Sequence, residues 1–202
     1  LNNLFAVKNN NFEFSHSINA VIGHVLRDIV SKVEKVNIGY SQRNNLNKVD
    51  QTVIMCFQQS KHISKISRKL KQIINIVDPT LEVCLCNTTD EKNDSIKINI
   101  DKALIRAKNT KKRAVIALTG KQGYLGVTID KCDLVILMTP SQSMDFVYQA
   151  MFRCMTEANG KKNGYVIDLD IDRSITAVAE YGKYISKDIK SNNDAIHRVI
   201  NN

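Results

Sequence analysis

Residues 113–170 decide the fold of this chain, and their sequence is RAVIALTGKQGYLGVTIDKCDLVILMTPSQSMDFVYQAMFRCMTEANGKKNGYVIDLD. Short apolar runs in this stretch have the length of strands. They are separated by a glycine-containing loop and by a segment whose apolar residues recur with helical spacing. The pattern predicts strands at 113–118, 133–138 and 165–169, a loop at 119–126 and a helix at 143–156.

The upstream part of the chain continues this alternation. The apolar run TVIMCF at 52–57 is typical of a parallel strand that is covered on both faces. A further strand is predicted at 81–86, and helical patterns occupy residues 15–36, 61–77, 98–108 and 171–189. Strands that alternate with helices predict a parallel sheet with right-handed crossovers. We therefore expect an α/β fold, a RecA-like or other doubly wound parallel sheet of about five strands with flanking helices, plus an N-terminal helical segment.

Composition sets limits on the partners of the chain. Its 202 residues carry a net charge of +9, which favours a polyanionic partner such as nucleic acid, although a solvated lysine-rich surface would explain the same charge. No apolar run approaches the roughly 18 residues of a membrane span. No signal-peptide pattern is present either, so we expect an intracellular, cytoplasmic protein. Because the chain begins with Leu rather than Met, we expect it to be part of a longer protein.

The cysteines do not have the spacing of a metal site. There are five of them, at Cys56, Cys84, Cys86, Cys132 and Cys154. No C-x-x-C pair occurs and the four histidines are scattered, so zinc is not expected. Most of the cysteines fall in predicted strands or in the predicted 143–156 helix, which indicates buried thiols in a reducing compartment.

Two polar residues stand out on the predicted helix at 143–156. Gln149 and Arg153 lie four residues apart, so they share one face of an α-helix. An arginine on such a face suits phosphate binding, because its planar fork binds oxygens in pairs and keeps its charge at any physiological pH. An ordinary surface arginine, solvated or in an ion pair, would give the same sequence pattern.

The glycine loop does not carry a complete nucleotide-binding signature. The pattern G-x-x-x-x-G-K-[ST] is absent, because neither Gly120-Lys121 nor Gly160-Lys161 is followed by Ser or Thr. The glycines at 120, 123 and 126 would let a backbone approach a phosphate closely, and an ordinary turn would explain them equally well. A free-standing P-loop ATPase is therefore not expected.

The segment 117–173, ALTGKQGYLGVTIDKCDLVILMTPSQSMDFVYQAMFRCMTEANGKKNGYVIDLDIDR, resembles the second RecA-like domain of superfamily 2 helicases. It is most similar to those of restriction subunits and of large cytoplasmic DNA viruses. Residues 119–130 resemble helicase motif V, residues 149–156 resemble motif VI, and residues 52–60 resemble motif IV more loosely. The resemblance implies an N-terminal helical segment and loop at 1–50, a RecA-like helicase domain at 51–172 and a C-terminal helical extension at 173–202.

The resemblance also implies a function. The chain would be the C-terminal lobe of a nucleic-acid-dependent ATPase or helicase, with ATP and Mg²⁺ bound mainly by an N-terminal lobe of the same protein, so that the isolated domain is inactive. Arg153 would be the arginine finger with Gln149 beside it, and Gly126 and Thr128 would lie near the nucleotide. DNA or RNA would follow the strand ends, at Gln58, Gln59, Ser60, Thr119, Gly120 and Lys121. The implied locations include a viral factory or virion.

Two alternatives to this function stay open, and one departure from the family favours the first of them. Many members carry a second arginine three residues after the first, where this chain has Thr156. An inactive helicase-like domain that only contacts other proteins would tolerate that change. The other alternative is a stand-alone α/β nucleotide- or cofactor-binding enzyme, such as a methyltransferase. That enzyme would need an acidic residue at the end of the second strand to hold a ribose, where this chain has Cys86-Asn87.

Overall fold

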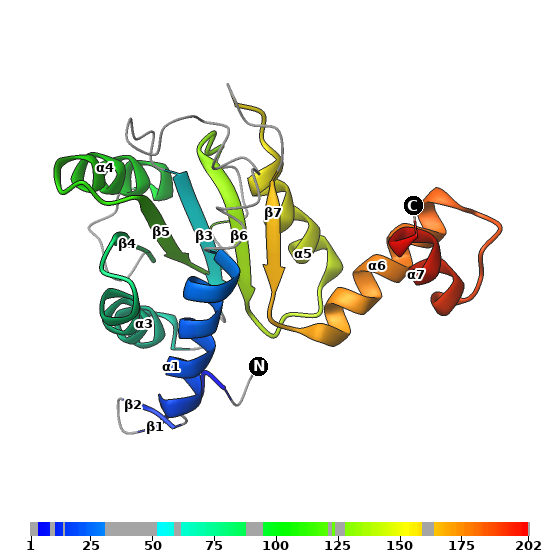
Figure 1. Cartoon of the computed structure of the whole chain (residues 1–202), viewed down its shortest axis with the longest axis horizontal. Helices are drawn as coiled ribbons and strands as arrows, with labels where there is room; N and C mark the ends of the chain where they lie inside the picture. Colours follow the sequence, from blue (N-terminus) through cyan, green and yellow to red (C-terminus); the bar gives the residue numbers. More distant parts are fainter. Residues whose placement is uncertain are drawn as a thin grey trace.

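A five-stranded parallel sheet forms the centre of this computed structural model, with the strand order β4-β5-β3-β6-β7 (Figure 1). The strands are β3 (Thr52–Gln58), β4 (Leu81–Cys86), β5 (Ala114–Thr119), β6 (Cys132–Met138) and β7 (Tyr165–Asp168). The structure describes residues 4–8, 11–13, 15–30, 52–58, 62–87, 95–120, 123, 128–158 and 164–201. The expected α/β fold with a parallel sheet of five strands and flanking helices is confirmed.

Helices cover both faces of the sheet. The buried side chains of α1 (Ser15–Gly23) and α3 (Ile63–Val77) share a hydrophobic core with one face, and those of α4 (Ile96–Asn109) and α5 (Met144–Met151) share a second core with the other face. Successive residues of β3 alternate between the two cores, as the strand period of two requires. This double burial explains the continuous apolar runs in the sequence. All five cysteines are buried thiols, as expected.

The N-terminal segment packs onto the same sheet. A small antiparallel hairpin of β1 (Val7–Lys8) and β2 (Asn11–Phe12) precedes α1. The helix predicted at 15–36 begins at Ser15 as an α-helix but continues as a π-helical segment, η1 (His24–Val30), and residues 31–36 lie outside the described residues. Buried apolar side chains of α1 and η1 join those of α3 in one core, so this segment forms part of the covering layer.

The helix predicted at 143–156 is shorter than expected. α5 ends at Met151 and is followed by η3, a 3-10 turn at Phe152–Met155. Such tightening is common at the carboxyl end of an α-helix. Here it allows the Cys154 thiol to donate a hydrogen bond to the Met151 carbonyl oxygen at 3.0 Å. Arg153 therefore lies on the 3-10 turn.

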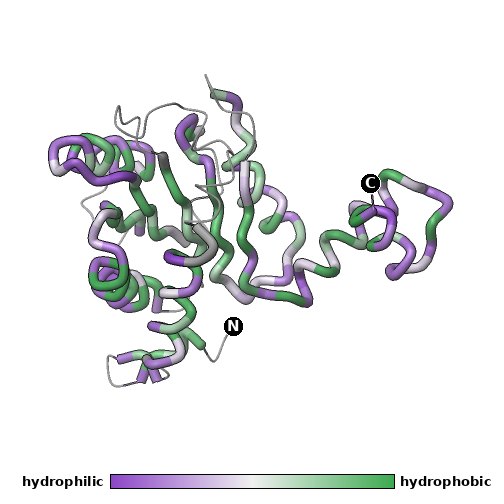
Figure 2. Tube along the Cα trace, in the orientation of Figure 1, coloured by the Kyte–Doolittle hydropathy of each residue, from purple (hydrophilic) through white to green (hydrophobic). Residues whose placement is uncertain are grey.

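The C-terminal helices form an arm that extends away from the sheet (Figure 1). α6 (Ile171–Ile185) follows β7, and α7 (Asn192–Ile200) folds back against α6. The helix predicted at 171–189 therefore ends earlier than expected, at Ile185. A Cβ atom on Gly182 would lie 2.3 Å from the carbonyl oxygen of Ala195, so only glycine allows this approach. Figure 2 shows hydrophilic and hydrophobic residues mixed along the arm, whereas the strands are largely hydrophobic. None of the helices in the described part of the chain has the length and apolar character needed to cross a membrane.

Ion pairs fix the amino end of the sheet. Arg113, which precedes β5, donates to the Asp78 carboxylate at 2.6 Å and to the Thr80 hydroxyl at 2.9 Å. Glu82 on β4 pairs in the same way with Arg106 at 2.9 Å and with Lys112 at 3.2 Å. Partial burial alone would raise the pKa of Glu82, but the hydrogen bonds from Arg106 and Lys112 outweigh it and lower that pKa. These contacts lie at the end of the sheet opposite the candidate ligand edge.

Candidate functional site

The carboxyl ends of β3 and β5 meet at one edge of the sheet, and the polar side chains there point inward. Phe57 pairs with Thr119 in the parallel ladder, which places Gln58 just beyond that rung. The Gln58 side chain is only 1% exposed, and its Oε1 accepts a hydrogen bond of 3.0 Å from the Ser67 hydroxyl of α3. Asn87, after β4, donates to the same hydroxyl at 2.7 Å. Gln58, Ser67 and Asn87 thus form a buried polar network that joins two strand ends to α3.

The glycine loop begins directly after β5, at the same edge of the sheet as this polar network. Thr119 is fully buried and its hydroxyl donates to the Gly120 carbonyl oxygen at 3.4 Å. A Cβ on Gly123 would lie 2.4 Å from the Thr119 Oγ1 atom, so Gly123 packs directly on the Thr119 side chain. A Cβ on Gly120 would meet the Ile63 side chain at 2.3 Å. Gly120 therefore packs closely on Ile63 of α3, and Gly123 packs closely on Thr119 of β5. Gln59, Ser60, Lys121 and Gly126 lie outside the described residues.

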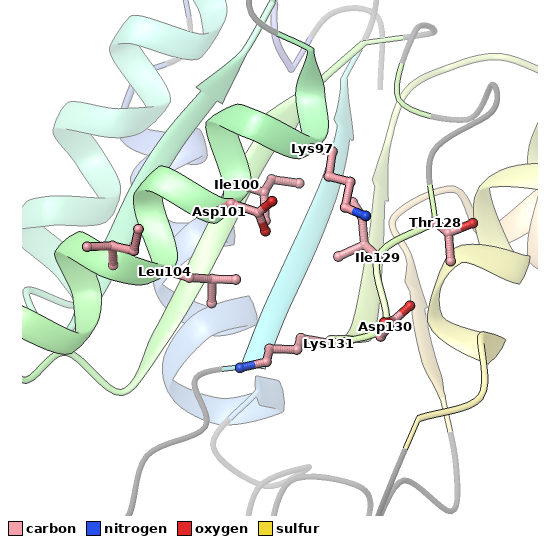
Figure 3. Close-up of a pocket in the computed structure, with 9 residues that line it drawn as sticks. Lys97, Ile100, Asp101, Leu104, Thr128, Ile129, Asp130 and Lys131 are labelled. Atoms are coloured by element: carbon pink, nitrogen blue, oxygen red, sulfur yellow. The ribbon is translucent and has the colours of Figure 1, made fainter.

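Thr128 lies in a different place, on the rim of a cavity of about 340 Å³ (Figure 3). The cavity lies between α4 and the segment that leads into β6, and its lining includes Ile100 and Leu104 on one side and Ile129 on the other. Lys97, Asp101, Asp130 and Lys131 add charged groups to it. Among the described residues that line it, neither Gln149 nor Arg153 appears. This cavity is thus separate from the predicted arginine finger.

Gln149 and Arg153 lie along α5 and the turn that follows it. The helix starts after Ser143, whose hydroxyl accepts a hydrogen bond from the Phe146 amide. Gln149 is exposed, and Arg153 is partly buried with its Nε atom inside the protein. Gln149 lies in the last turn of α5, and Arg153 lies in the 3-10 turn that follows it. Because a 3-10 turn advances about 20° more per residue than an α-helix, Arg153 is rotated further from Gln149 than a continuous α-helix would place it.

The η3 turn that carries Arg153 also exposes apolar side chains. Its neighbours Phe152 and Met155 are 60% and 50% exposed, although both are large apolar side chains. The next residue, Cys154, is fully buried against the sheet and fixes the turn. Aromatic residues, Met and Arg are side chains that are enriched at protein interfaces relative to the rest of the surface. The α5–η3 segment thus carries an arginine between two exposed apolar side chains.

The two groups of predicted residues lie at opposite ends of α5. The helix begins at the carboxyl end of β6, the edge that also carries Gln58, Thr119 and Gly120. It runs toward the amino end of β7, where Gly164 packs on the turn that carries Arg153. A ligand at the carboxyl edge and a ligand at Arg153 would therefore occupy separate sites on this chain.

Arg173 is a site residue that the sequence analysis does not single out. It is 1% exposed, and its Nε donates to the Asp168 carboxylate at 2.8 Å. Its Nη1 donates to the carbonyl oxygens of Thr139 at 2.7 Å and Ser141 at 2.6 Å. Arg173 thereby joins the end of β7 to the loop that starts α5. An arginine in the first turn of a helix, directly after a strand that ends in aspartate, is the sequence signal that could have identified it.

The chain is similar to solved structures of helicases and related ATPases. Lhr helicase of Mycobacterium smegmatis, bound to single-stranded DNA and AMP-PNP, matches 95% of this chain at 15% identity with a TM-score of 0.46, and this chain covers 21% of Lhr. The DEAD-box protein SrmB of E. coli, bound to RraA, matches 85% at 13% identity with a TM-score of 0.45, and 80% of it is covered. The C-terminal part of the Fun30 ATPase domain matches 97% at 15% identity with a TM-score of 0.48, and 56% of it is covered.

These similarities concern the fold alone, because identities of 13–15% do not extend to function. No protein-family model and no curated protein sequence matches the chain.

Gly164→Ala should move the turn that carries Arg153. A Cβ at residue 164 would lie 2.0 Å from the backbone carbonyl oxygen of Cys154, and a backbone atom cannot rotate away as a side chain can. Overpacking of this kind typically destabilises a protein by about 1–3 kcal/mol. We expect chemical denaturation to show that loss, with Gly23→Ala as the matched control, because a Cβ there meets no atom within 4 Å. Equal stability of the two variants would show that η3 shifts freely.

Proposed function

We propose that this chain is the C-terminal lobe of a nucleic-acid-dependent ATPase of the superfamily 2 helicase kind. The observation that carries the proposal is Arg153 on the η3 turn, partly buried and flanked by exposed Phe152 and Met155. A second lobe that covers Phe152 and Met155 would bring its bound nucleotide to the guanidinium. The Gly126-Val127-Thr128 sequence favours the restriction-subunit or large DNA virus type within this class. A protein of that type would act inside the cell, in the cytoplasm, and the viral type would act in a viral factory or virion.

In this proposal the chain supplies half of the ATP site. The preceding lobe of the same protein holds ATP and Mg²⁺, and Arg153 stabilises the charge that develops on the transferring phosphoryl group. Gln149, which is exposed on α5 four residues before Arg153, would contact the nucleotide or orient the guanidinium. Gly126 and Thr128 would lie on the nucleotide side of the closed cleft. Thr128 is exposed, as such a contact requires.

The proposed nucleic-acid track follows the carboxyl edge of the sheet. Lys121, Gln59 and Ser60 would contact phosphates directly. Thr119 and Gly120 are buried, so they would act by holding the start of the loop in place. Because the Gln58 side chain is turned inward to Ser67, Gln58 would act by holding the strand end in place. α3 starts at the same edge and carries Lys65, Arg68, Lys69 and Lys71 without any acidic residue. Such a helix supports sequence-independent binding to a phosphate backbone.

The proposal is tested by the ATP turnover of the isolated 202-residue chain and of the full-length protein. We expect none from the isolated chain, because it lacks a complete phosphate-binding loop. We expect turnover from the full-length protein that single-stranded nucleic acid increases. Steady turnover by the isolated chain would favour a stand-alone α/β enzyme. A full-length protein with no turnover under any condition would favour an inactive domain that only contacts other proteins.

A further inference from the structure

α6 is tied to the start of α5 by a buried arginine. Arg173 lies in the first turn of α6, and the same guanidinium binds both oxygens of Asp168 and the carbonyl oxygens of Thr139 and Ser141. Ser141 is two residues before Ser143, the residue that caps α5. The Arg173 side chain thus fixes the loop from which the helix with Gln149 and Arg153 begins.

Two more contacts join α6 and its start to the same segment. The side-chain amide of Gln142 donates to the Asp170 carboxylate at 3.1 Å, and Asp170 is the residue that caps α6. Farther along, the Tyr148 hydroxyl on α5 donates to the Glu180 carboxylate on α6 at 3.2 Å. Partial burial, followed by the nearby Glu180 carboxylate, raises the pKa of Tyr148, so its hydroxyl remains a proton donor. Tyr148 is the direct neighbour of Gln149.

The three contacts act along the length of α5. Arg173 and Asp170 hold the loop before the helix, and Glu180 holds its second turn. An α-helix of eight residues transmits such a constraint to its far end because it moves as one rigid body of about 12 Å. The far end is the η3 turn that carries Arg153.

We propose that Arg173 is a positioning residue for the arginine finger, and that α6 acts as a brace that fixes Arg153 in its catalytic position. The inference rests on the proposed function and extends it. Arg173 touches no nucleotide; it acts through Thr139, Ser141 and α5. A misplacement of about 1 Å at a reacting group lowers the rate by roughly a hundredfold. The position of α6 is thereby linked to ATP turnover, because a movement of α6 would also move Arg153.

The test compares Arg173→Lys with Arg113→Lys. Both arginines bind an aspartate and a second oxygen acceptor, but Arg113 lies at the amino end of the sheet, away from α5. A lysine keeps the charge and loses the planar fork in both variants. In the full-length protein, Arg173→Lys should lower the kcat for ATP by about a hundredfold with little change in KM, as a misplaced finger predicts. Arg113→Lys should leave both constants near their wild-type values.

Hydrogen exchange on the 202-residue chain separates the two proposals. Arg173→Lys should speed amide exchange in α5 and η3, and Arg113→Lys should not. Tyr148→Phe removes only the contact to Glu180. It should speed amide exchange in α5 without unfolding the chain, and it should lower kcat by less than Arg173→Lys does.

Unchanged exchange in α5 for both Arg173→Lys and Tyr148→Phe would overturn the inference. A folded Arg173→Lys protein with wild-type kcat would overturn it as well. If the wild-type full-length protein has no ATP turnover, the proposed function fails, and the exchange result alone then decides whether α6 braces α5.

Discussion

Arg153→Ala in the full-length protein should lower nucleic-acid-stimulated ATP turnover by about a thousandfold, the loss expected on removal of an arginine finger. The affinity for ATP should change far less, because the contact to the γ-phosphate strengthens mainly in the transition state. Arg153→Lys should not restore turnover, since an ammonium group cannot bind two phosphate oxygens in the way a guanidinium does. The measurements are the steady-state turnover and the dissociation constant of a non-hydrolysable ATP analogue.

The matched control is Arg198→Ala, which removes an exposed arginine of α7. It should retain wild-type turnover, and circular dichroism should show that both alanine variants are folded. A folded Arg153→Ala protein with near-normal turnover would mean that Arg153 is a structural residue of the η3 turn. The assignment of residues 149–156 to helicase motif VI would then be wrong.

Single-stranded nucleic acid should bind this chain with a strong salt dependence. Neutralised phosphates release counterions, so affinity falls as salt rises. A track that contacts about four phosphates of a single strand would have a log–log slope of about −3, which is a loss of about 50-fold between about 50 and 200 mM salt. Fluorescence anisotropy with a labelled oligonucleotide measures both the affinity and the slope.

A pair of lysine variants locates the bound strand. Lys65→Gln, on the exposed face of α3 near the carboxyl edge, should reduce the steepness of that slope by about 0.7, the share of one phosphate contact on a single strand. Lys187→Gln, beyond the end of α6, should leave the slope unchanged. Absence of binding even at low salt, or an equal effect of the two variants, would contradict a track along the carboxyl edge and α3.

Much of the fold follows from local sequence patterns. The run at 52–57 predicts a strand buried on both faces because every residue in it is apolar or small, and β3 is the central strand with helices on both sides. The spacing of Gln149 and Arg153 predicts that they share one helix face, but α5 ends at Met151 and Arg153 lies on the 3-10 turn that follows. The buried position of the five cysteines follows from their place within strands and helices.

Contacts between distant residues account for what the sequence does not predict. The end of α5 at Met151 depends on the packing of Cys154 against Gly164, ten residues away. The inward turn of Gln58 depends on Ser67 and Asn87, which come from two other elements. The contacts of Arg173 to the carbonyl oxygens of Thr139 and Ser141 form only once β7, α6 and the loop at 139–141 come together. No local spacing records such contacts, because each requires the sheet to be assembled first.

The most direct test of the proposed ATP site is a structure of the full-length protein with Mg²⁺, ADP, aluminium fluoride and a single-stranded oligonucleotide. The fluoride stands in for the transferring phosphoryl group. We predict that the Arg153 guanidinium donates hydrogen bonds of about 2.7–2.9 Å to it across the cleft, as charge-assisted contacts to phosphate do. We also predict that Phe152 and Met155 lie covered by the second lobe. A nucleotide bound far from Arg153, with Phe152 and Met155 still exposed to solvent, would contradict the account.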